Sequence, residues 1–467
     1  MDYFYDGNGG GGIMADTFMY ISLFLIWSML FYHMFLMQGG YLHSVKYRKK
    51  AREWEKNRTP FPRVSILIPA HNEEVVIRDT LESMCSLRYP LDRLEVIVIN
   101  DNSSDRTGEI VDEFTRNYDF IKAIHTKPPF GGKGKSAALN IGFAQATGDI
   151  ICVYDADNTP EPDAIYWHAI ALMNDSQAGA SVGKFRVINA GKNLLTRLIN
   201  IETLTFQWLA QAGRWYWFKM TTIPGTNFAI RRSILEELGG WDEKALSEDT
   251  ELSFRVYNLG YYIRFFPEAV TWEQEPETLR VWWRQRTRWA RGNLYVIAKY
   301  MLRFFKLKNK KVGVDLFYFF FTYLLFFGGV MVSHVIFIMN LFVDLNLTIG
   351  YVSYALLILG FLLFVTEGIL TLSMEKDQLN TKTFFTVILM YFTYSQLWIL
   401  LVAYSTFLEL KRILLRQEVK WYKTKRFAGA GAVAGGSSGA AVGSRDTGTG
   451  PASQKTLKEE VKGESSG

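Results

Sequence analysis

Residues 93–114 read RLEVIVINDNSSDRTGEIVDEF, a β-branched run that leads through a polar turn into a helical segment. The same order occurs at 63–86, where RVSILIPAHNEE ends its apolar run near a proline and places acidic residues at the start of a helix. Further strands are predicted at 120–126 and 149–157, with a helix at 135–146 between them. Strands that alternate with helices predict an α/β fold in which a parallel sheet is covered by helices on both faces.

A polar cluster follows each of three predicted strands: AHNEE at 70–74, NDNSSD at 100–105 and DADN at 155–158. In sheets of this kind, ligands bind beyond the carboxyl ends of the strands. We therefore expect the three clusters to converge on one crevice.

The apolar run IICVYDADNTP at 150–160 ends in two carboxylates, Asp155 and Asp157. Two acids at the end of a buried strand are costly unless they face water or a cation. On an extended segment, the Asp-x-Asp spacing points both side chains the same way. Oxygen ligands suit Mg²⁺ or Mn²⁺, which shares its coordination with substrate phosphates. A solvated turn or helix cap is the other interpretation, and these residues alone leave both open.

Two further stretches carry charged side chains that could contribute to the same crevice. SEDTELSFRVYNLGY at 247–261 places Glu248 and Asp249 at the start of a predicted helix, where Ser247 is a candidate cap and helix capping accounts for one of the acids. GGKGKSAALN at 131–140 lacks the spacing of a Walker A loop. Its Lys133 or Lys135 contacts a phosphate, or the loop is simply flexible.

The stretch LRVWWRQRTRWARGN at 279–293 is both aromatic and basic. Its Arg residues recur at helical spacing, which predicts an amphipathic helix in a membrane interface. We expect the same helix to present Gln285, Arg288 and Trp289 to a site, because Arg can neutralise a phosphate and Trp can stack on a sugar ring.

Four apolar segments are long enough to be membrane spans. Residues 17–37 contain no charged side chain and follow a leader without basic residues, which fits a membrane helix better than a cleaved signal peptide. Three more candidates lie at roughly 315–343, 349–373 and 384–409. The basic loop after the first segment places the N-terminus outside and residues 44 onward in the cytoplasm.

The C-terminal topology is open. Basic stretches at 46–58, 303–311 and 411–426 flank apolar segments, which favours membrane-edge anchoring and argues against a nucleic-acid partner. Three crossings from a cytoplasmic start would leave 411–426 outside, against the positive-inside rule. Either one segment is interfacial or re-entrant, or 313–350 crosses twice, or the rule fails here. The only two cysteines, Cys85 and Cys152, cannot form a disulfide framework or a Cys-based metal site.

The motifs IPAHNEE, NDNSSDRT, DAD, PGTNFAIRR (224–232), SED and QRTRW occur in the order seen in processive glycosyltransferases of family 2. The chain resembles the membrane synthases related to bacterial cellulose synthase, hyaluronan synthase and poly-N-acetylglucosamine synthase over about residues 60–300. The ordered set is specific. One departure is Ser247, which stands where the family usually has Thr but keeps the hydroxyl.

The resemblance implies an α/β catalytic domain of the GT-A type, with a Rossmann-like mixed sheet, joined to an all-α transmembrane region. It implies that Asp249 is the general base with Glu248 beside it, and that Asp157 holds Mg²⁺ or Mn²⁺. The implied donor-binding residues are Ala70, Asn72, Glu73, Asp101, Lys133, Asp155, Gln285 and Arg288. The implied acceptor-binding residues are Gly225, Thr226, Asn227 and Trp289.

The implied function is processive, inverting transfer from a UDP-sugar donor, UDP-glucose or UDP-N-acetylglucosamine, to a growing β-linked polysaccharide. The enzyme would lie in the plasma membrane with its catalytic domain in the cytoplasm, and would export the polymer through its own helices. Because the membrane part is small, a second copy or an accessory partner is a further hypothesis. The alternatives are transfer of a single sugar to a lipid acceptor and a sensor or scaffold with a degenerate domain. The second would predict loss of an acid from DAD or SED, and none is lost.

The expected domain organisation follows the same boundaries. It comprises an extracytoplasmic leader (1–16), a transmembrane helix (17–42), a basic linker (43–59), a GT-A domain (60–275), interfacial helices with QRTRW (276–312), about three transmembrane helices (313–410), a basic juxtamembrane segment (411–426) and a disordered tail rich in Gly, Ala and Ser (427–467).

Overall fold

The computed structural model describes residues 9–56, 61–245, 247–302, 304–306, 309, 311–343, 345, 347 and 350–415. The tail at 427–467, most of the basic segment at 411–426, half of the leader and the end of the basic linker lie outside the described residues.

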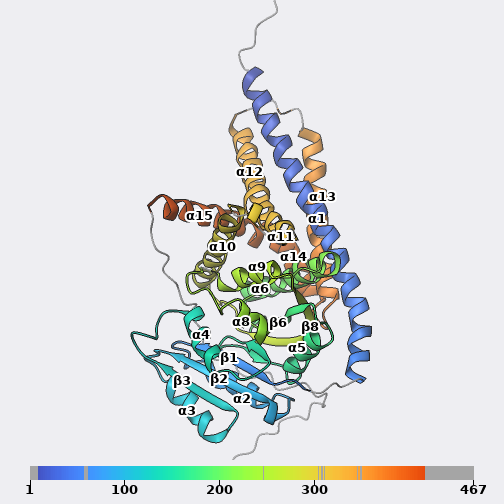
Figure 1. Ribbon diagram of the computed structural model, residues 1–467. Helices are drawn as coiled ribbons and strands as arrows, with labels where there is room; N and C mark the ends of the chain where they lie inside the picture. Colours follow the sequence, from blue (N-terminus) through green and yellow to red (C-terminus); the bar gives the residue numbers. More distant parts are fainter. Residues whose placement is uncertain are drawn as a thin grey trace, which may run out of the picture. The chain divides into compact units, whose positions relative to one another are not determined.

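An eight-stranded mixed sheet forms the centre of the expected catalytic part, residues 61–275 (Figure 1), in the order β3-β2-β1-β4-β7-β6-β8-β5. The strands β1 to β4 pair in parallel, β7 is antiparallel to both β4 and β6, β6 and β8 are parallel, and β5 is antiparallel to β8. The expected GT-A-like mixed sheet joined to apolar helices is therefore confirmed. The strands are β1 (Val64–Ala70), β2 (Leu94–Asp101), β3 (Ile121–Thr126), β4 (Ile150–Val153), β5 (Thr159–Pro160), β6 (Ala178–Val187), β7 (Phe228–Arg231) and β8 (Tyr262–Glu273).

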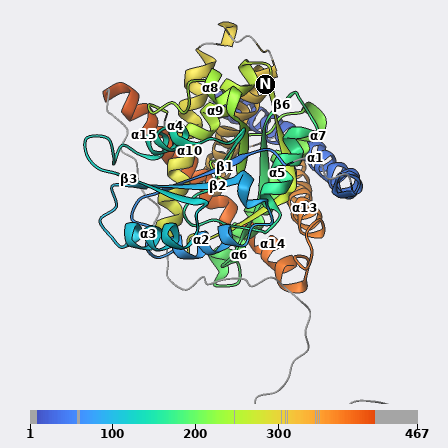
Figure 2. The same cartoon turned by 60° about the horizontal axis from the view of Figure 1, so that its bottom comes forward.

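Helices cover both faces of this sheet. Figure 2 shows α2 and α3 on one side of β1 and β2 and α4 on the other. Alternate strand residues divide accordingly: Ile66 and Val96 pack in one buried cluster, and Leu67 and Ile97 in another. The helices that flank the sheet are α2 (Ile77–Cys85), η1 (Leu91–Arg93), α3 (Thr107–Asn117), α4 (Lys135–Gln145), α5 (Ala164–Met173), α6 (Leu194–Thr205), the π-helix η2 (Phe206–Gly213), α7 (Arg214–Phe218), α8 (Arg232–Glu237) and α9 (Glu248–Asn258).

The Asp-x-Asp segment is not extended, contrary to the sequence argument. Strand β4 ends at Val153, and the chain then turns, with the Asn158 amide donating to the Asp155 carbonyl (3.0 Å). The two carboxylates share a side of the crevice because of this turn and not because of strand alternation.

Apolar helices lie beside the catalytic part. Among the described residues, four segments are long and apolar enough to cross a membrane: Ile13–Tyr47, Asp315–Phe342, Ala355–Ser373 and Thr381–Leu415. The helices outside the sheet-containing part are α1 (Gly9–Lys56), α10 (Leu279–Met301), η3 (Phe304–Lys306), α11 (Lys311–Phe320), the π-helix η4 (Phe321–Phe326), α12 (Phe327–Phe342), α13 (Gly350–Ser373), α14 (Thr381–Phe392) and α15 (Tyr394–Leu415). Of these, α10 and η3 are not part of the four apolar segments.

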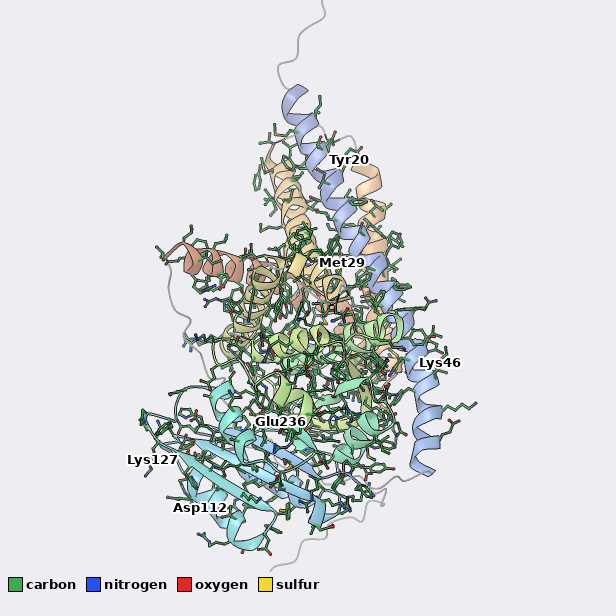
Figure 3. All side chains as sticks on the ribbon, in the orientation of Figure 1. Tyr20, Met29, Lys46, Asp112, Lys127 and Glu236 are labelled. Atoms are coloured by element: carbon green, nitrogen blue, oxygen red, sulfur yellow. The ribbon has the colours of Figure 1, made fainter. Side chains whose placement is uncertain are left out.

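The first helix, α1, packs against both the other apolar helices and the catalytic part. It contacts α12 and α13 in its upper half, and η2 and α7 farther along. In Figure 3, Tyr20 lies in the upper part of α1 and Lys46 in the lower part, where Lys46 Nζ donates to Tyr216 Oη (2.7 Å). At the crossing with η2, a Cβ on Gly40 would overlap the Trp208 carbonyl, and one on Gly213 would overlap the Leu36 carbonyl. The two backbones can therefore approach only at glycine.

Three ion pairs, which involve the buried acids Glu375 and Asp315, join the apolar helices to the catalytic part. The Glu375 carboxylate, just after α13, accepts from Lys184 Nζ and from Arg186 Nη2 of β6 (2.7 Å each), and also from Trp208 Nε1 (2.9 Å). Arg214 of α7 pairs with Asp315 of α11.

We expect the Glu375→Ala variant to lose about 3 kcal/mol of unfolding free energy, because it leaves the buried Lys184 ammonium without its carboxylate. Thermal unfolding of the purified protein in detergent measures this. The matched control is Glu236→Ala, which breaks an ion pair whose Glu is 56% exposed and should change little. Equal shifts in the two variants would contradict the anchoring role of Glu375.

Candidate active site

A cavity of about 1560 Å³ begins beyond the carboxyl ends of β1, β2 and β4 and continues between α1, α12 and α13. Its lining contains most of the residues that the sequence singled out, from segments far apart in the chain. Those that it brings together are Ala70, Glu73, Asp101, Asp155, Asp157, Gly225, Thr226, Glu248, Asp249, Gln285, Arg288 and Trp289.

Lys135, the first residue of α4, is the cation at the centre of the acidic part of this cavity. Its Nζ lies 2.6 Å from Asp155 Oδ1 and 3.7 Å from Glu248 Oε1, and it donates to the Gly225 carbonyl (2.8 Å). Burial alone would lower the pKa of Lys135, but the charges of Asp155 and Glu248 outweigh it and raise that pKa. The ammonium therefore stays charged and offsets the repulsion between the acids.

Of the two lysines that the sequence offered in this loop, Lys135 lines the cavity and Lys133 does not. The two lysines are two positions apart, and the α4 helix begins between them, after Gly134. The start of α4 is the signal that distinguishes the two lysines. A side chain in the first turn of this helix can point toward the strand ends, whereas a side chain in the preceding loop is not directed there by a helix.

Glu248 and Asp249 open α9, but they differ in environment. Burial, together with the neighbouring charge of Asp249, raises the pKa of Glu248, while Lys135 and Arg288 act in the opposite direction. Asp249 Oδ1 accepts from Ser247 Oγ (2.7 Å) and from the Thr250 amide (2.6 Å). The hydroxyl of Ser247, expected as a helix cap, thus holds the Asp249 carboxylate in place.

The second oxygen of Asp249 faces Gly225. A Cβ at this glycine would lie 2.9 Å from Asp249 Oδ2 and 3.6 Å from Lys135 Nζ, and its φ of +89° also favours glycine. The Pro-Gly-Thr-Asn turn can therefore approach the Asp249 carboxylate this closely because Gly225 has no side chain.

At the other end of the acidic part, Asp101 is fixed at the end of β2. Its Oδ1 accepts from Thr126 Oγ1 (2.8 Å) and from the Gly132 amide (2.7 Å), and its side chain is 6% exposed. The loop that carries Lys133 is thereby tied to the same strand end.

Two predicted contact residues support the site from outside the lining. Asn72 Oδ1 accepts from the Ser104 amide (2.7 Å), which joins the polar clusters after β1 and β2. Asn227 is fully buried, and its Nδ2 donates to the Lys184 and Ala269 carbonyls (2.9 Å each). His168 Nε2 lies 3.1 Å from Asn227 Oδ1, and burial lowers the pKa of His168 to about 4, which keeps its ring neutral.

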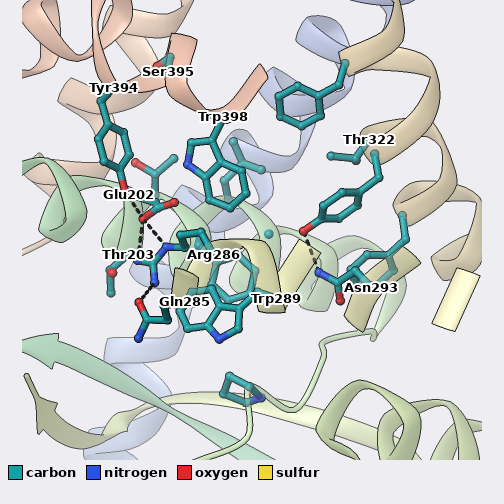
Figure 4. Close-up of a pocket in the computed structure, with 18 of the residues that line it drawn as sticks. Glu202, Thr203, Gln285, Arg286, Trp289, Asn293, Thr322, Tyr394, Ser395 and Trp398 are labelled. Carbon is teal, nitrogen blue, oxygen red and sulfur yellow. Dashed lines mark hydrogen bonds and ion pairs between the residues drawn. The ribbon is translucent and has the colours of Figure 1, made fainter. Parts of the chain in front are cut away.

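Arg286, a residue that the sequence reasoning passed over, organises the QRTRW segment (Figure 4). Its guanidinium donates to Gln285 Oε1 (2.6 Å) and to Glu202 Oε2 of α6 (2.8 Å), and lies 3.5 Å from Glu275 Oε2. Its Cζ lies 4.0 Å from the centroid of the Trp289 ring. The buried Arg286 therefore fixes both Gln285 and Trp289.

The same network reaches the C-terminal helices. Tyr394 Oη donates to Glu202 Oε2 (2.7 Å), and Trp282 Nε1 donates to Tyr394 Oη (2.7 Å). Figure 4 shows Tyr394 and Trp398 on the far side of Glu202 from Gln285. Helix α15 is thus hydrogen-bonded, through one carboxylate, to the residues around Trp289.

The donor atoms at Asp155 and Asp157 fit a hard divalent cation. Among the described residues there is no cluster of three or more His, Cys, Asp or Glu side chains that could hold a metal alone. Mg²⁺ is usually held by one or two carboxylates and completes its shell with water and substrate phosphates. Asp157, which lines the cavity beside Asp155, provides this kind of partial site.

If Trp289 binds the acceptor as the sequence predicts, we expect Arg286→Lys to lower kcat/KM for the acceptor roughly tenfold. Lysine lacks the planar group that stacks on Trp289 while it also binds two carboxylates. The KM for the expected donor should stay within about twofold. The control is Arg284→Lys, which changes an exposed residue of the same helix. Steady-state kinetics with each substrate varied in turn measure this, and equal losses for donor and acceptor would contradict a positioning role.

Comparison with known proteins places these features in context. Residues 65–239 match the family described as Glycosyl transferase family 2. The chain is 66% identical over 414 residues to "Probable glycosyltransferase YdaM" of Bacillus subtilis (strain 168), covering 89% of this chain and 99% of that protein. It is 33% identical over 236 residues to "Poly-beta-1,6-N-acetyl-D-glucosamine synthase" of Staphylococcus epidermidis, covering 50% of this chain and 56% of that protein.

Among solved structures, the mannosyltransferase PcManGT from Pyrobaculum calidifontis, in complex with GDP-Man and Mn²⁺, aligns with a TM-score of 0.49 and 19% identity. That alignment covers 78% of this chain and 99% of PcManGT.

Proposed function

Because the chain belongs to glycosyltransferase family 2, we propose that it is a membrane-embedded, inverting and processive enzyme that polymerises a sugar from a UDP-sugar donor into a β-linked exopolysaccharide. The observation that carries this proposal is the single cavity. It holds both acidic motifs, Lys135 and Arg288, and it continues past Trp289 between the apolar helices.

The donor occupies the acidic part. Asp101 contacts the uridine, while Ala70 and Glu73 line the same end. Lys135, Gln285 and Arg288 bind the diphosphate, whose negative charge matches the two cations. A divalent cation held by Asp157 supplies further positive charge for the departing diphosphate. The Gln285 amide nitrogen is free to donate to a phosphate because its Oε1 accepts from Arg286.

The acceptor approaches from the Trp289 side. Asp249 takes the proton from the attacking hydroxyl through Oδ2, since Oδ1 is held by Ser247 and the Thr250 amide. Gly225 and Thr226 line the cavity beside Asp249 and contact the sugar, and Trp289, 41% exposed, stacks on it. A single in-line displacement inverts the anomeric carbon, so an α-linked donor gives a β-linked product.

The apolar helices support export of the product. A polar polymer does not cross hydrocarbon unaided, and the cavity runs from the catalytic residues toward Ser333, His334 and Asn340 of α12. In this proposal the catalytic part lies on the cytoplasmic side of the plasma membrane. A second copy or an accessory partner completes the channel if three helices do not enclose it.

The orientation of helix α15 favours one of the open C-terminal topologies, the one in which a segment lies in the membrane interface. In Figure 1, α15 runs roughly crosswise to α12, and it contacts α10 and α12. Arg291 of α10 donates to Glu409 of α15 (3.4 Å). An interfacial α15 keeps the basic residues after it on the cytoplasmic side, in agreement with the positive-inside rule.

The similarity to a poly-N-acetylglucosamine synthase supports N-acetylglucosamine as the sugar, with glucose as the other candidate. The alternative of a lipid acceptor is favoured by the many apolar residues between α1, α12 and α13, such as Leu30, Phe337 and Phe364. Incubation of the purified enzyme with each labelled UDP-sugar, followed by gel sizing and linkage-specific hydrolases, separates these candidates. Products of a single added sugar would contradict processivity.

We expect Asp249→Asn to lower transfer by about 10³-fold, because the base is lost, while UDP binds within about threefold of the wild-type affinity. Calorimetric UDP titration and a labelled-sugar assay measure the two effects. The control, Asp92→Asn, removes a carboxylate that is 80% exposed and should leave both values unchanged. Near-normal transfer by Asp249→Asn would remove this residue from the base role.

Removal of divalent cations with EDTA should abolish transfer, and added Mg²⁺ or Mn²⁺ should restore it. We expect Asp157→Asn to need at least about tenfold more metal for half-maximal activity, since it lacks the carboxylate that holds the cation. Titration of activity against metal concentration measures this. Full activity in EDTA would argue against a metal-dependent reaction.

A further inference from the structure

A carboxylic acid lies inside the apolar helices, away from the catalytic acids. Glu367 of α13 is 6% exposed and lines the cavity, within the segment Ala355–Ser373 that is apolar enough to cross a membrane. An ionisable residue within a membrane-spanning segment is energetically costly, and such residues usually serve a function.

Glu367 has no hydrogen-bond or ion-pair partner among the residues that the structure describes, and its Oε1 is fully buried. This sets it apart from three other acids, of which Asp315 and Glu375 are also buried. Glu202 is held by Arg286 and Tyr394, Asp315 by Arg214, and Glu375 by Lys184 and Arg186. The cavity that Glu367 lines is the place from which a bound molecule can supply the missing hydrogen-bond partner.

The surroundings of Glu367 define what that partner can be. One helical turn away on α13, Phe364 also lines the cavity, and farther along Gly360 does so with a Cβ position 3.7 Å from Leu30 of α1. Toward the catalytic part, the lining continues through Tyr323 and Asn293, which are hydrogen-bonded to each other (2.7 Å), to Trp289. A molecule that extends from Trp289 along this wall reaches Glu367.

We propose that Glu367 is a saccharide-binding residue that hydrogen-bonds hydroxyl groups of the polymer after it leaves the catalytic residues. This inference rests on the proposed function and adds a binding position inside the apolar helices. A polyhydroxylated chain offers both donors and acceptors to a carboxyl group, whereas an acyl or isoprenyl chain offers neither. An aromatic residue beside a carboxyl group, as Phe364 is here, also suits the mixed surface of a sugar ring.

The test compares Glu367→Leu and Glu367→Gln with the wild-type enzyme in lipid vesicles. The labelled donor is whichever of UDP-glucose and UDP-N-acetylglucosamine the wild type incorporates. The leucine variant should shorten the median product at least about fivefold, because it can make no hydrogen bond to the chain. The glutamine variant should stay within about twofold of wild type. The matched control is Thr366→Val, which removes an exposed hydroxyl from the adjacent position of the same helix.

A second measurement separates binding from folding. Because Glu367 lacks a protein partner, Glu367→Leu should unfold in detergent at the same temperature as the wild type or a higher one. A lower unfolding temperature for Glu367→Leu would show that the carboxyl group has a structural role, and would overturn the inference.

The remaining outcomes also decide the matter. Polymer of normal length from Glu367→Leu overturns this inference and leaves the proposed function intact. Single-sugar products from the wild type with both donors overturn the inference together with the proposed function.

Discussion

The catalytic part depends on the ion pairs of Lys135. Its Nζ lies 2.6 Å from Asp155 Oδ1 and 3.7 Å from Glu248 Oε1. It joins two acidic motifs that are about ninety positions apart in the sequence, and it also binds the Gly225 carbonyl of the turn between them. Without a cation there, the carboxylates that converge at the strand ends would repel one another. The protein thus holds both acidic motifs together through its own cation. In the proposed function, a bound diphosphate takes over part of this charge balance.

Much of this arrangement can be read from the sequence. The strand–turn–helix repeats at 63–86 and 93–114 predict the parallel half of the sheet, and the polar clusters after those strands predict where the crevice opens. The antiparallel strand β7 and the pairing of β6 with β8 come from long-range contacts, which no local pattern records. The sequence also does not show that Asn227 and Asn72 hydrogen-bond to backbone groups. A motif shows that a side-chain amide is present, but not whether it faces a ligand or the backbone.

Arg286 illustrates the same limit at the site. Within QRTRW, the sequence directed attention to Gln285, Arg288 and Trp289, but Arg286 is the buried residue that orients two of them. Its partners Glu202 and Glu275 lie far away in the sequence, and Tyr394 joins the network from a C-terminal helix. The catalytic part and the apolar helices therefore share hydrogen bonds, and a change in α15 can reach Trp289 through one carboxylate.

In the proposed function, the acids of two separate loops, Lys135 and an arginine of α10 surround one sugar-nucleotide. A cryo-electron microscopy structure of the protein with UDP and Mg²⁺ would test this arrangement. We expect the diphosphate within hydrogen-bonding distance of Lys135 and Arg288, with a divalent cation held by Asp157. A nucleotide bound elsewhere, or a diphosphate that touches neither cation, would contradict it.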